Sequence, residues 1–124
     1  MQQYEEIAKS VVTYYYQTFT TNRQGLAALY RPTSMLTFEG TPVQGTESIV
    51  AKLISLPITT VVPVLDTMDA QPSGGNNVLV CVTGRMQVDG GMPEGMRFSQ
   101  TFQLMPEANG NYYIFNDVFR LNYG

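Results

Sequence analysis

The chain has 124 residues, of which 44% are hydrophobic and 14% charged, a size and balance that predict one domain over residues 1–124 and exclude a disordered chain. Its ten acidic residues outnumber seven scattered basic ones, which excludes a nucleic-acid surface, and no apolar run approaches the ~20 residues that span a bilayer. The absence of histidine and the single cysteine, Cys81, exclude His-based triads, His metal sites and an internal disulfide framework, so we expect no metal and no cofactor.

Two helices are predicted at the start of the chain. The first runs from Gln3 to Phe19, where apolar residues recur at a helical period: Tyr4, Ile7, Val11, Tyr14, Tyr15 and Phe19. The consecutive tyrosines at positions 14–16 cannot all face one way, so some lie at the rim with a hydroxyl reaching a partner or water. Thr21-Asn22 is typical of an N-cap and predicts a second, short helix from Arg23 to Tyr30, which Pro32 stops.

A short strand pair and a third helix are predicted next. Ser34 to Glu39 is typical of a strand, and Gly40-Thr41-Pro42 is a turn signal before a return strand, Val43-Gln44. Thr46 is predicted to cap a helix that runs to about Leu56 and is closed by Pro57.

The rest of the chain predicts four strands, at residues 59–70, 77–89, 97–105 and 111–121. Gly-, Pro- and Asn-rich segments separate them, and these tight connections favour antiparallel neighbours. Helices first and strands later indicate the α+β class, with the helices packed on one face of a curved sheet.

The strand that begins at Val78 is apolar on both faces. Val78, Val80 and Val82 alternate with Leu79, Cys81 and Thr83. A strand of this kind is covered on both sides, and the helices cover only one. Two explanations remain: a homodimer packed sheet to sheet, or a loop of the same chain lying over the outer face.

The order of these elements, together with several motifs, resembles the nuclear transport factor 2 family over essentially the whole chain. The motifs are Val12 to Phe19 with Tyr15 and Tyr16, Leu36 to Gly40, Gln44-Gly45, Ile49 to Pro57, Asp69 to Pro72, and the ending Asn116 to Tyr123. The resemblance implies a cone-like fold in which a bent antiparallel sheet is wrapped on three helices. It also implies a homodimer through the outer face of the sheet.

The same resemblance implies a function: nuclear import of the Ran GTPase in its GDP form. The GTPase would insert an aromatic side chain into an apolar cavity whose rim carries Glu39 and Asp89. The cavity would be lined by Phe38, Leu56, Ile58, Val61, Met86, Val88, Met96 and Phe119. Tyr4 would bind phenylalanine-glycine repeats of nucleoporins. Such a carrier works in cytoplasm and nucleus, is enriched at the nuclear pore, and has no chemistry of its own; no signal peptide is expected.

The chain departs from the family in one loop, where Gly91 stands in place of a second acid and Glu94 is a candidate replacement. A histidine common near the position of Pro63 is absent as well. Losing one exposed ion pair costs at most ~1 kcal/mol, so we expect the function to survive.

Two alternatives stay open. The same fold includes isomerases and dehydratases, and a site of the ketosteroid isomerase kind is conceivable from the available carboxylates and tyrosines: Tyr15, Tyr16, Asp69 and Asp117. The other alternative is a dimeric scaffold module.

Overall fold

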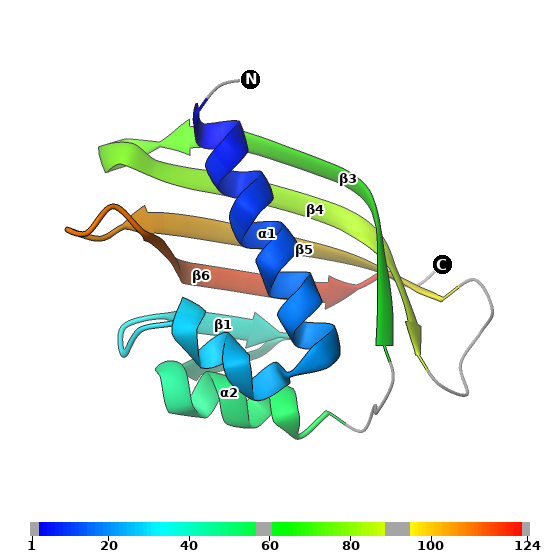
Figure 1. Ribbon diagram of the computed structural model, residues 1–124. Coiled ribbons are helices and arrows are strands. Elements are labelled where there is room, and N and C mark those ends of the chain that lie inside the picture. The colour runs from blue at the N-terminus through cyan, green and yellow to red at the C-terminus, as the bar shows by residue number, and fades with distance from the viewer. Residues whose placement is uncertain (1–2, 57–60, 89–94, 123–124) are drawn as a thin grey trace.

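A computed structural model describes residues 3–56, 61–88 and 95–122. Three helical elements lie on the inner face of a curved sheet (Figure 1). They are the α-helix α1 (Gln3–Thr21), the 3-10 helix η1 (Arg23–Leu29) and the α-helix α2 (Thr46–Ile54). No helix among the described residues is long and apolar enough to cross a membrane.

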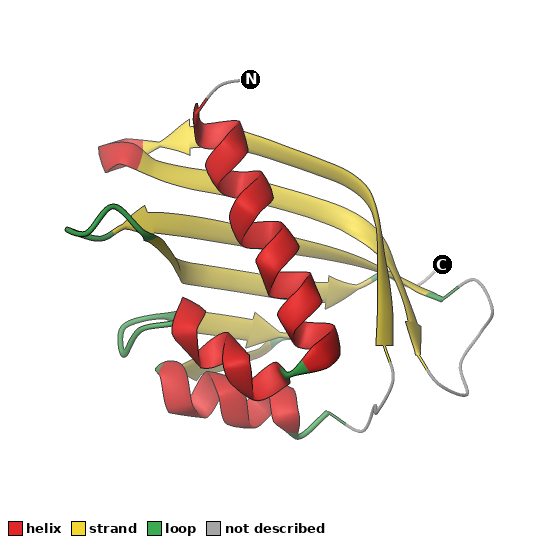
Figure 2. Cartoon of the chain, viewed as in Figure 1, coloured by secondary structure: helices red, strands yellow, loops and turns green. Residues whose placement is uncertain are grey.

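The sheet has six strands in the order β2-β1-β6-β5-β4-β3. Their bounds are β1 (Met35–Phe38), β2 (Thr41–Gln44), β3 (Val61–Ser73), β4 (Asn77–Val88), β5 (Met96–Pro106) and β6 (Tyr112–Leu121). All neighbours are antiparallel except β1 and β6, which are parallel, so the sheet is mixed. The α+β class and the arrangement of helices against a bent sheet are confirmed (Figure 2).

The bend of the sheet has a local cause in β3 and β4. Their register shifts between Leu65 and Thr67, which marks a β-bulge. Opposite the bulge stands Gly84, where any Cβ would collide with the carbonyl oxygen of Val64. Glycine at this position therefore lets the two backbones approach closely while both strands curve around the helices (Figure 1).

The face of α1 that packs on the sheet differs in part from the predicted one. Its buried residues are Ala8, Val12, Tyr15, Tyr16 and Phe19. Tyr14, predicted on the apolar stripe, is 47% exposed, whereas Tyr16 is buried. The physical reason is a buried hydrogen-bond partner for Tyr16, described below, which hydrophobic periodicity cannot reveal.

Two helix starts also differ from the prediction. Gly45, with φ of 94°, takes the N-cap position of α2, so the prediction that Thr46 is the cap was wrong by one residue. Asn22 holds the N-cap position of η1 but makes no side-chain cap hydrogen bond. The hydroxyl of Thr21 instead donates to the carbonyl of Gln17, in the preceding turn of α1.

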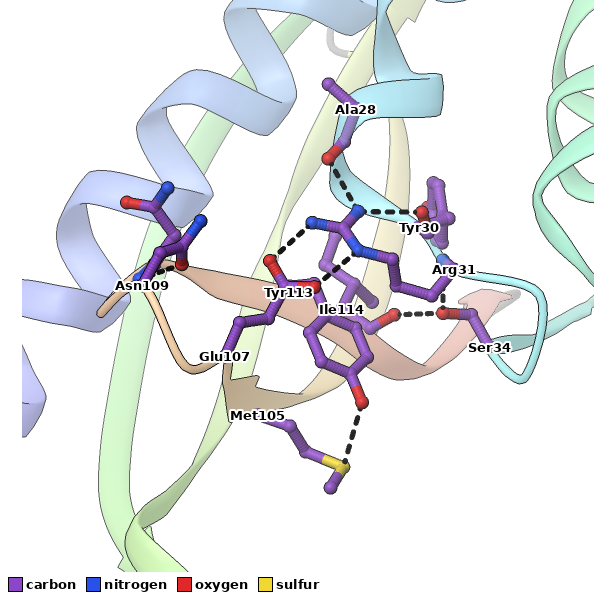
Figure 3. A network of polar contacts seen from close by, with 10 residues as sticks. Ala28, Tyr30, Arg31, Ser34, Met105, Glu107, Asn109, Tyr113 and Ile114 are labelled. Carbon is purple, nitrogen blue, oxygen red and sulfur yellow. Dashed lines mark hydrogen bonds and ion pairs between the residues drawn. The ribbon is translucent and has the colours of Figure 1, made fainter.

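Arg31 joins the end of η1 to the turn between β5 and β6 (Figure 3). Its Nε and Nη2 each donate to a carboxylate oxygen of Glu107 at 2.7 Å, and its Nη1 donates to the carbonyls of Ala28 and Tyr30. These hydrogen bonds hold the pKa of the Glu107 carboxyl below its usual range. Next to Arg31, the hydroxyl of Ser34 donates to the carbonyl of Ile114 at 2.6 Å, which fixes the start of β1 beside β6.

Candidate functional site

An apolar cavity of about 180 Å³ lies between the helices and the inner face of the sheet. Residues from α1, β1, α2, β4, β5 and β6 meet around it, so the cavity depends on the whole fold. We call it the apolar cavity; it is lined by Tyr15, Phe19, Leu36, Phe38, Leu53, Leu56, Met86, Met96, Gln100, Phe119 and Leu121.

Five of the predicted lining residues meet in this cavity: Phe38, Leu56, Met86, Met96 and Phe119. Ile58 and Asp89 lie outside the described residues, and Val61 and Val88 are placed only as members of β3 and β4. For these four residues, the place in the site stays a prediction.

Six lining residues were not predicted as such: Tyr15, Phe19, Leu36, Leu53, Gln100 and Leu121. Alternation along β5 and β6 could have found the last two, because Gln100 shares a face with Phe98 and Phe102, which are buried. A polar residue at such a position is a signal of a buried hydrogen-bond network.

Aromatic rings form one part of the cavity wall. Phe38 and Phe119, on the parallel strands β1 and β6, stack with centroids 4.8 Å apart and an interplanar angle of 2°. The ammonium of Lys52 lies 5.6 Å from the Phe38 centroid. The guanidinium of Arg23 lies 5.2 Å from the centroid of Phe19. These contacts fix the rings that the cavity exposes.

Glu39 stands at the border of the cavity. It follows Phe38 directly and has a positive φ of 51°, at the turn between β1 and β2. Its Oε1 accepts a hydrogen bond from the backbone N–H of Leu121, and its own N–H donates to the Phe119 carbonyl at 3.1 Å. Both partners line the cavity, so the carboxylate is held beside its opening in a partly exposed position.

Behind the apolar cavity lies a buried cluster of polar side chains, which we call the polar network: Tyr15, Tyr16, Tyr30, Gln100 and Asp117. Gln100 donates to Asp117 Oδ1 at 2.7 Å and to the Tyr15 hydroxyl at 3.3 Å, and it accepts from the Tyr16 hydroxyl at 2.5 Å. The Tyr30 hydroxyl donates to Asp117 Oδ2 at 2.7 Å. Each member of the network is thereby paired.

Burial controls the protonation of this network. Burial raises the pKa of the Asp117 carboxyl to about 6, against the lowering effect of the hydrogen bonds from Gln100 and Tyr30. Burial also raises the pKa of Tyr15, Tyr16 and Tyr30 well above the usual value, so all three hydroxyls keep their protons. The network therefore holds one titratable group near neutral pH, Asp117.

Of the residues named for the enzyme alternative, Tyr15, Tyr16 and Asp117 meet in the polar network, but Asp69 does not join them. Asp69 is exposed on β3, opposite Cys81, which is exposed as well. Asp117 is buried on the inner face of the sheet, and both of its carboxyl oxygens accept hydrogen bonds. Within the described ranges, no three His, Cys, Asp or Glu residues are grouped so that they could hold a metal ion.

Tyr4 lies in a separate surface groove of about 450 Å³, between the start of α1 and the ends of β3, β4, β5 and β6. We call it the Tyr4 groove. Its other lining residues are Gln3, Ile7, Pro72, Asn76, Asn77, Val78, Pro106 and Tyr112. Two prolines and two tyrosine rings lie beside the amide side chains of Gln3, Asn76 and Asn77, so the groove is mixed in polarity and open to solvent.

The outer face of the sheet carries exposed apolar side chains. Leu79 on β4 and Val118 on β6 are exposed, as is Val62 on β3. In the described part of the chain, no helix packs on this face (Figure 1). The sequence predicts that both faces of β4 are covered, and these helices cover only its inner face.

A family model and several relatives match nearly the whole of this chain. Residues 7–121 match the family described as the nuclear transport factor 2 domain. Nuclear transport factor 2B of Arabidopsis thaliana is 51% identical over 120 residues, which cover 96% of this chain and 94% of that protein. Nuclear transport factor 2 of Emericella nidulans is 52% identical over 124 residues, covering 99% of this chain and 98% of that one.

A solved structure extends the similarity to three dimensions. Nuclear transport factor 2 from Cryptosporidium parvum matches with a TM-score of 0.91 at 49% identity, covering 97% of this chain and 95% of that chain. The similarity therefore spans the elements that build the apolar cavity and the polar network.

Proposed function

The chain belongs to the nuclear transport factor 2 family, and on that premise we propose that its apolar cavity receives an aromatic side chain of the Ran GTPase in the GDP-bound form. The protein is a nucleocytoplasmic import carrier and not an enzyme. Selectivity for GDP follows from the switch segments of the GTPase, which change conformation with the nucleotide.

The observation that carries the proposal is an apolar cavity with an acid at its border. An aromatic anchor buried in such a pocket is the usual centre of a protein–protein interface. Glu39, anchored to the backbone of Leu121, places a negative charge where basic residues of the partner approach. We expect Asp89 to add a second acid to the rim.

Calorimetric titration with Ran loaded with GDP, and separately with a GTP analogue, tests the proposal. We expect binding of the GDP form alone. Glu39→Lys should abolish it, and Glu39→Gln, which keeps an acceptor for Leu121, should weaken it about two- to tenfold. Glu47→Lys is the matched control, because Glu47 is exposed on α2 and does not line the cavity. Unchanged affinity of Glu39→Lys would contradict the site.

We also propose that the Tyr4 groove binds phenylalanine-glycine repeats of nucleoporins, which would enrich the carrier at the nuclear pore. A shallow, open groove with two tyrosine rings and two prolines in its wall suits weak, fast binding of a short aromatic motif. Tyr4→Ala should reduce capture of a repeat peptide and leave Ran binding unchanged. Tyr14→Ala is the control, since Tyr14 is an exposed tyrosine on the same helix outside the Tyr4 groove. Equal loss in both variants would contradict the assignment.

The exposed apolar outer face supports a homodimer packed sheet to sheet. Two copies would cover Leu79 and Val118 and would carry two Tyr4 grooves, which raises the avidity for repeats. Sedimentation should report a dimer for the native chain and a monomer for Leu79→Arg. A dimer that persists in this variant would place the interface elsewhere.

A further inference from the structure

The volume of the apolar cavity sets the size of ligand it accepts. At about 180 Å³ it has room for one six-membered aromatic ring with a small substituent. Apolar protein cavities of about 150 Å³ accept benzene. The cavity therefore has the size of a ligand site for a free small molecule as well as for a side chain.

The cavity wall offers few polar side-chain atoms, and these are hydrogen-bonded within the polar network. The polar atoms in the wall belong to Gln100 and to the Tyr15 hydroxyl. The side-chain amide of Gln100 donates to Asp117 and to Tyr15, and its side-chain carbonyl accepts from the Tyr16 hydroxyl. No buried side-chain nitrogen or oxygen among the described residues lacks a hydrogen-bond partner. A hydroxyl or amine carried into the cavity would lose its water and meet a wall that is mostly carbon and sulfur.

The opposite part of the wall is adaptable and polarizable. Met86 and Met96 lie side by side on β4 and β5 and both line the cavity. Thioether side chains adjust their rotamers to a ligand and make favourable contacts with aromatic rings. Phe38 and Phe119 add two stacked rings. An aromatic ring thus meets sulfur and ring surfaces on entering.

From these observations we infer that the cavity binds free, uncharged monocyclic aromatic molecules that lack hydrogen-bonding substituents, and that a bound ring excludes the aromatic side chain of the GTPase. The first part stands on the geometry of the cavity alone. The second part rests on the proposed function.

Toluene and phenol form a matched pair of probes, because a methyl group replaces a hydroxyl on the same ring. The chain labelled with ¹³C at its methionine methyl groups reports binding directly by NMR. Toluene should shift the Met86 and Met96 signals saturably, with a Kd on the order of 0.1–1 mM. Met35, which is 40% exposed on β1 and does not line the cavity, should not move. Phenol should bind at least about tenfold more weakly.

Two results would overturn the ligand class. One is the absence of a saturable shift at Met86 and Met96 up to the solubility of toluene. The other is binding of phenol as tight as that of toluene.

A pair of variants on α2 and the residues after it gives a further check. Leu56→Phe should fill the cavity and abolish the toluene shift, whereas Ile54→Phe, outside the cavity on α2, should not. If Leu56→Phe does not fold, the comparison of toluene with phenol still decides.

Competition separates this inference from the proposed function. Ran-GDP affinity measured in toluene at ten times its Kd should fall about tenfold. Unchanged Ran-GDP affinity, with toluene still bound at Met86 and Met96, would overturn the shared use of the cavity and leave the small-molecule site in place. Absence of Ran binding in all conditions would overturn the proposed function alone.

Discussion

The apolar cavity and the polar network lie next to each other on the inner face of the sheet and are built by opposite rules. The cavity leaves space unfilled and offers a partner mainly carbon and sulfur atoms. The network is buried and pairs its polar groups within itself. Tyr15 and Gln100 belong to both. The difference teaches that an unfilled apolar cavity needs a rigid structure next to it. The hydrogen bonds of the network hold Tyr15 and Gln100 in the cavity wall, and packing alone would let these side chains collapse into the cavity.

Removing the acceptor at the centre of the network should have the largest effect on stability. Asp117→Ala leaves the Tyr30 hydroxyl and the Gln100 amide without their buried acceptor. We expect the free energy of unfolding to fall by about 3–5 kcal/mol, measured by denaturant unfolding at fixed protomer concentration. Asp117→Asn, which keeps an acceptor for Tyr30, should lose far less. Equal losses would contradict this expectation: since Asn preserves the side-chain volume, they would show that the network needs both carboxyl oxygens of Asp117 and that the acceptor kept for Tyr30 contributes nothing.

The pH dependence of stability separates the polar network from the apolar cavity, because the network contains Asp117 and the cavity wall contains no carboxyl group. The pKa of Asp117 is raised from 3.8 to about 6, so the native state holds the proton more tightly than the unfolded chain. Its contribution is fully present below about pH 4 and is lost as the pH rises through 6. We expect a loss of about 3 kcal/mol by about pH 7. Unfolding of the native chain and of Asp117→Asn across this range isolates the effect; a constant difference between the two would refute it.

The two tyrosines of α1 that contact Gln100 should differ from each other. The Tyr16 hydroxyl donates at 2.5 Å, whereas the Tyr15 hydroxyl accepts at 3.3 Å beside the cavity. Tyr16→Phe should lower the free energy of unfolding by about 1–2 kcal/mol, and Tyr15→Phe by less than about 1 kcal/mol. Chemical unfolding of both variants at one pH checks the ranking, and a larger loss for Tyr15→Phe would reverse our account of the network.

Shortening a residue at the cavity edge should have the smallest effect on stability. Leu56 follows α2 and is only partly buried, so Leu56→Ala removes few packed contacts. We expect a loss of about 1 kcal/mol or less in the free energy of unfolding, together with at least about tenfold weaker Ran-GDP binding. Stability loss without loss of binding would place Leu56 in the core rather than in the site.

The helices and strands were predictable from sequence, because periodicity reports which side chains avoid water. Of the eleven residues that line the cavity, five were named beforehand, and these came from the family resemblance. Phe38 and Met86 are found where the resemblance places them, and the four long strands lie where the pattern predicts. The mixed sheet was not predictable from connection lengths, since the parallel pairing of β1 with β6 joins strands that no turn connects.

The polar network was not predictable, because it depends on side chains meeting across the fold. Gln100 lies on an apolar face of β5, and Tyr16 on a helix whose apolar stripe was assigned to Tyr14. From the sequence, Asp117 was a candidate acid of the enzyme alternative; in the structure both of its carboxyl oxygens accept hydrogen bonds inside the network, which gives it a structural role. Each residue alone is ambiguous, and the hydrogen bonds that explain all of them appear only in three dimensions.

The parallel pairing of β1 with β6 has a consequence for the order of folding. It joins residues 35–38 to residues 116–119, across most of the chain. During synthesis the helices and β1 leave the ribosome well before β6 exists, so the Phe38–Phe119 stack and the Tyr30–Asp117 hydrogen bond must wait until residues 112–121 have been made. The nascent chain therefore carries its apolar wall unassembled until β6 arrives, and its binding competence waits for that strand.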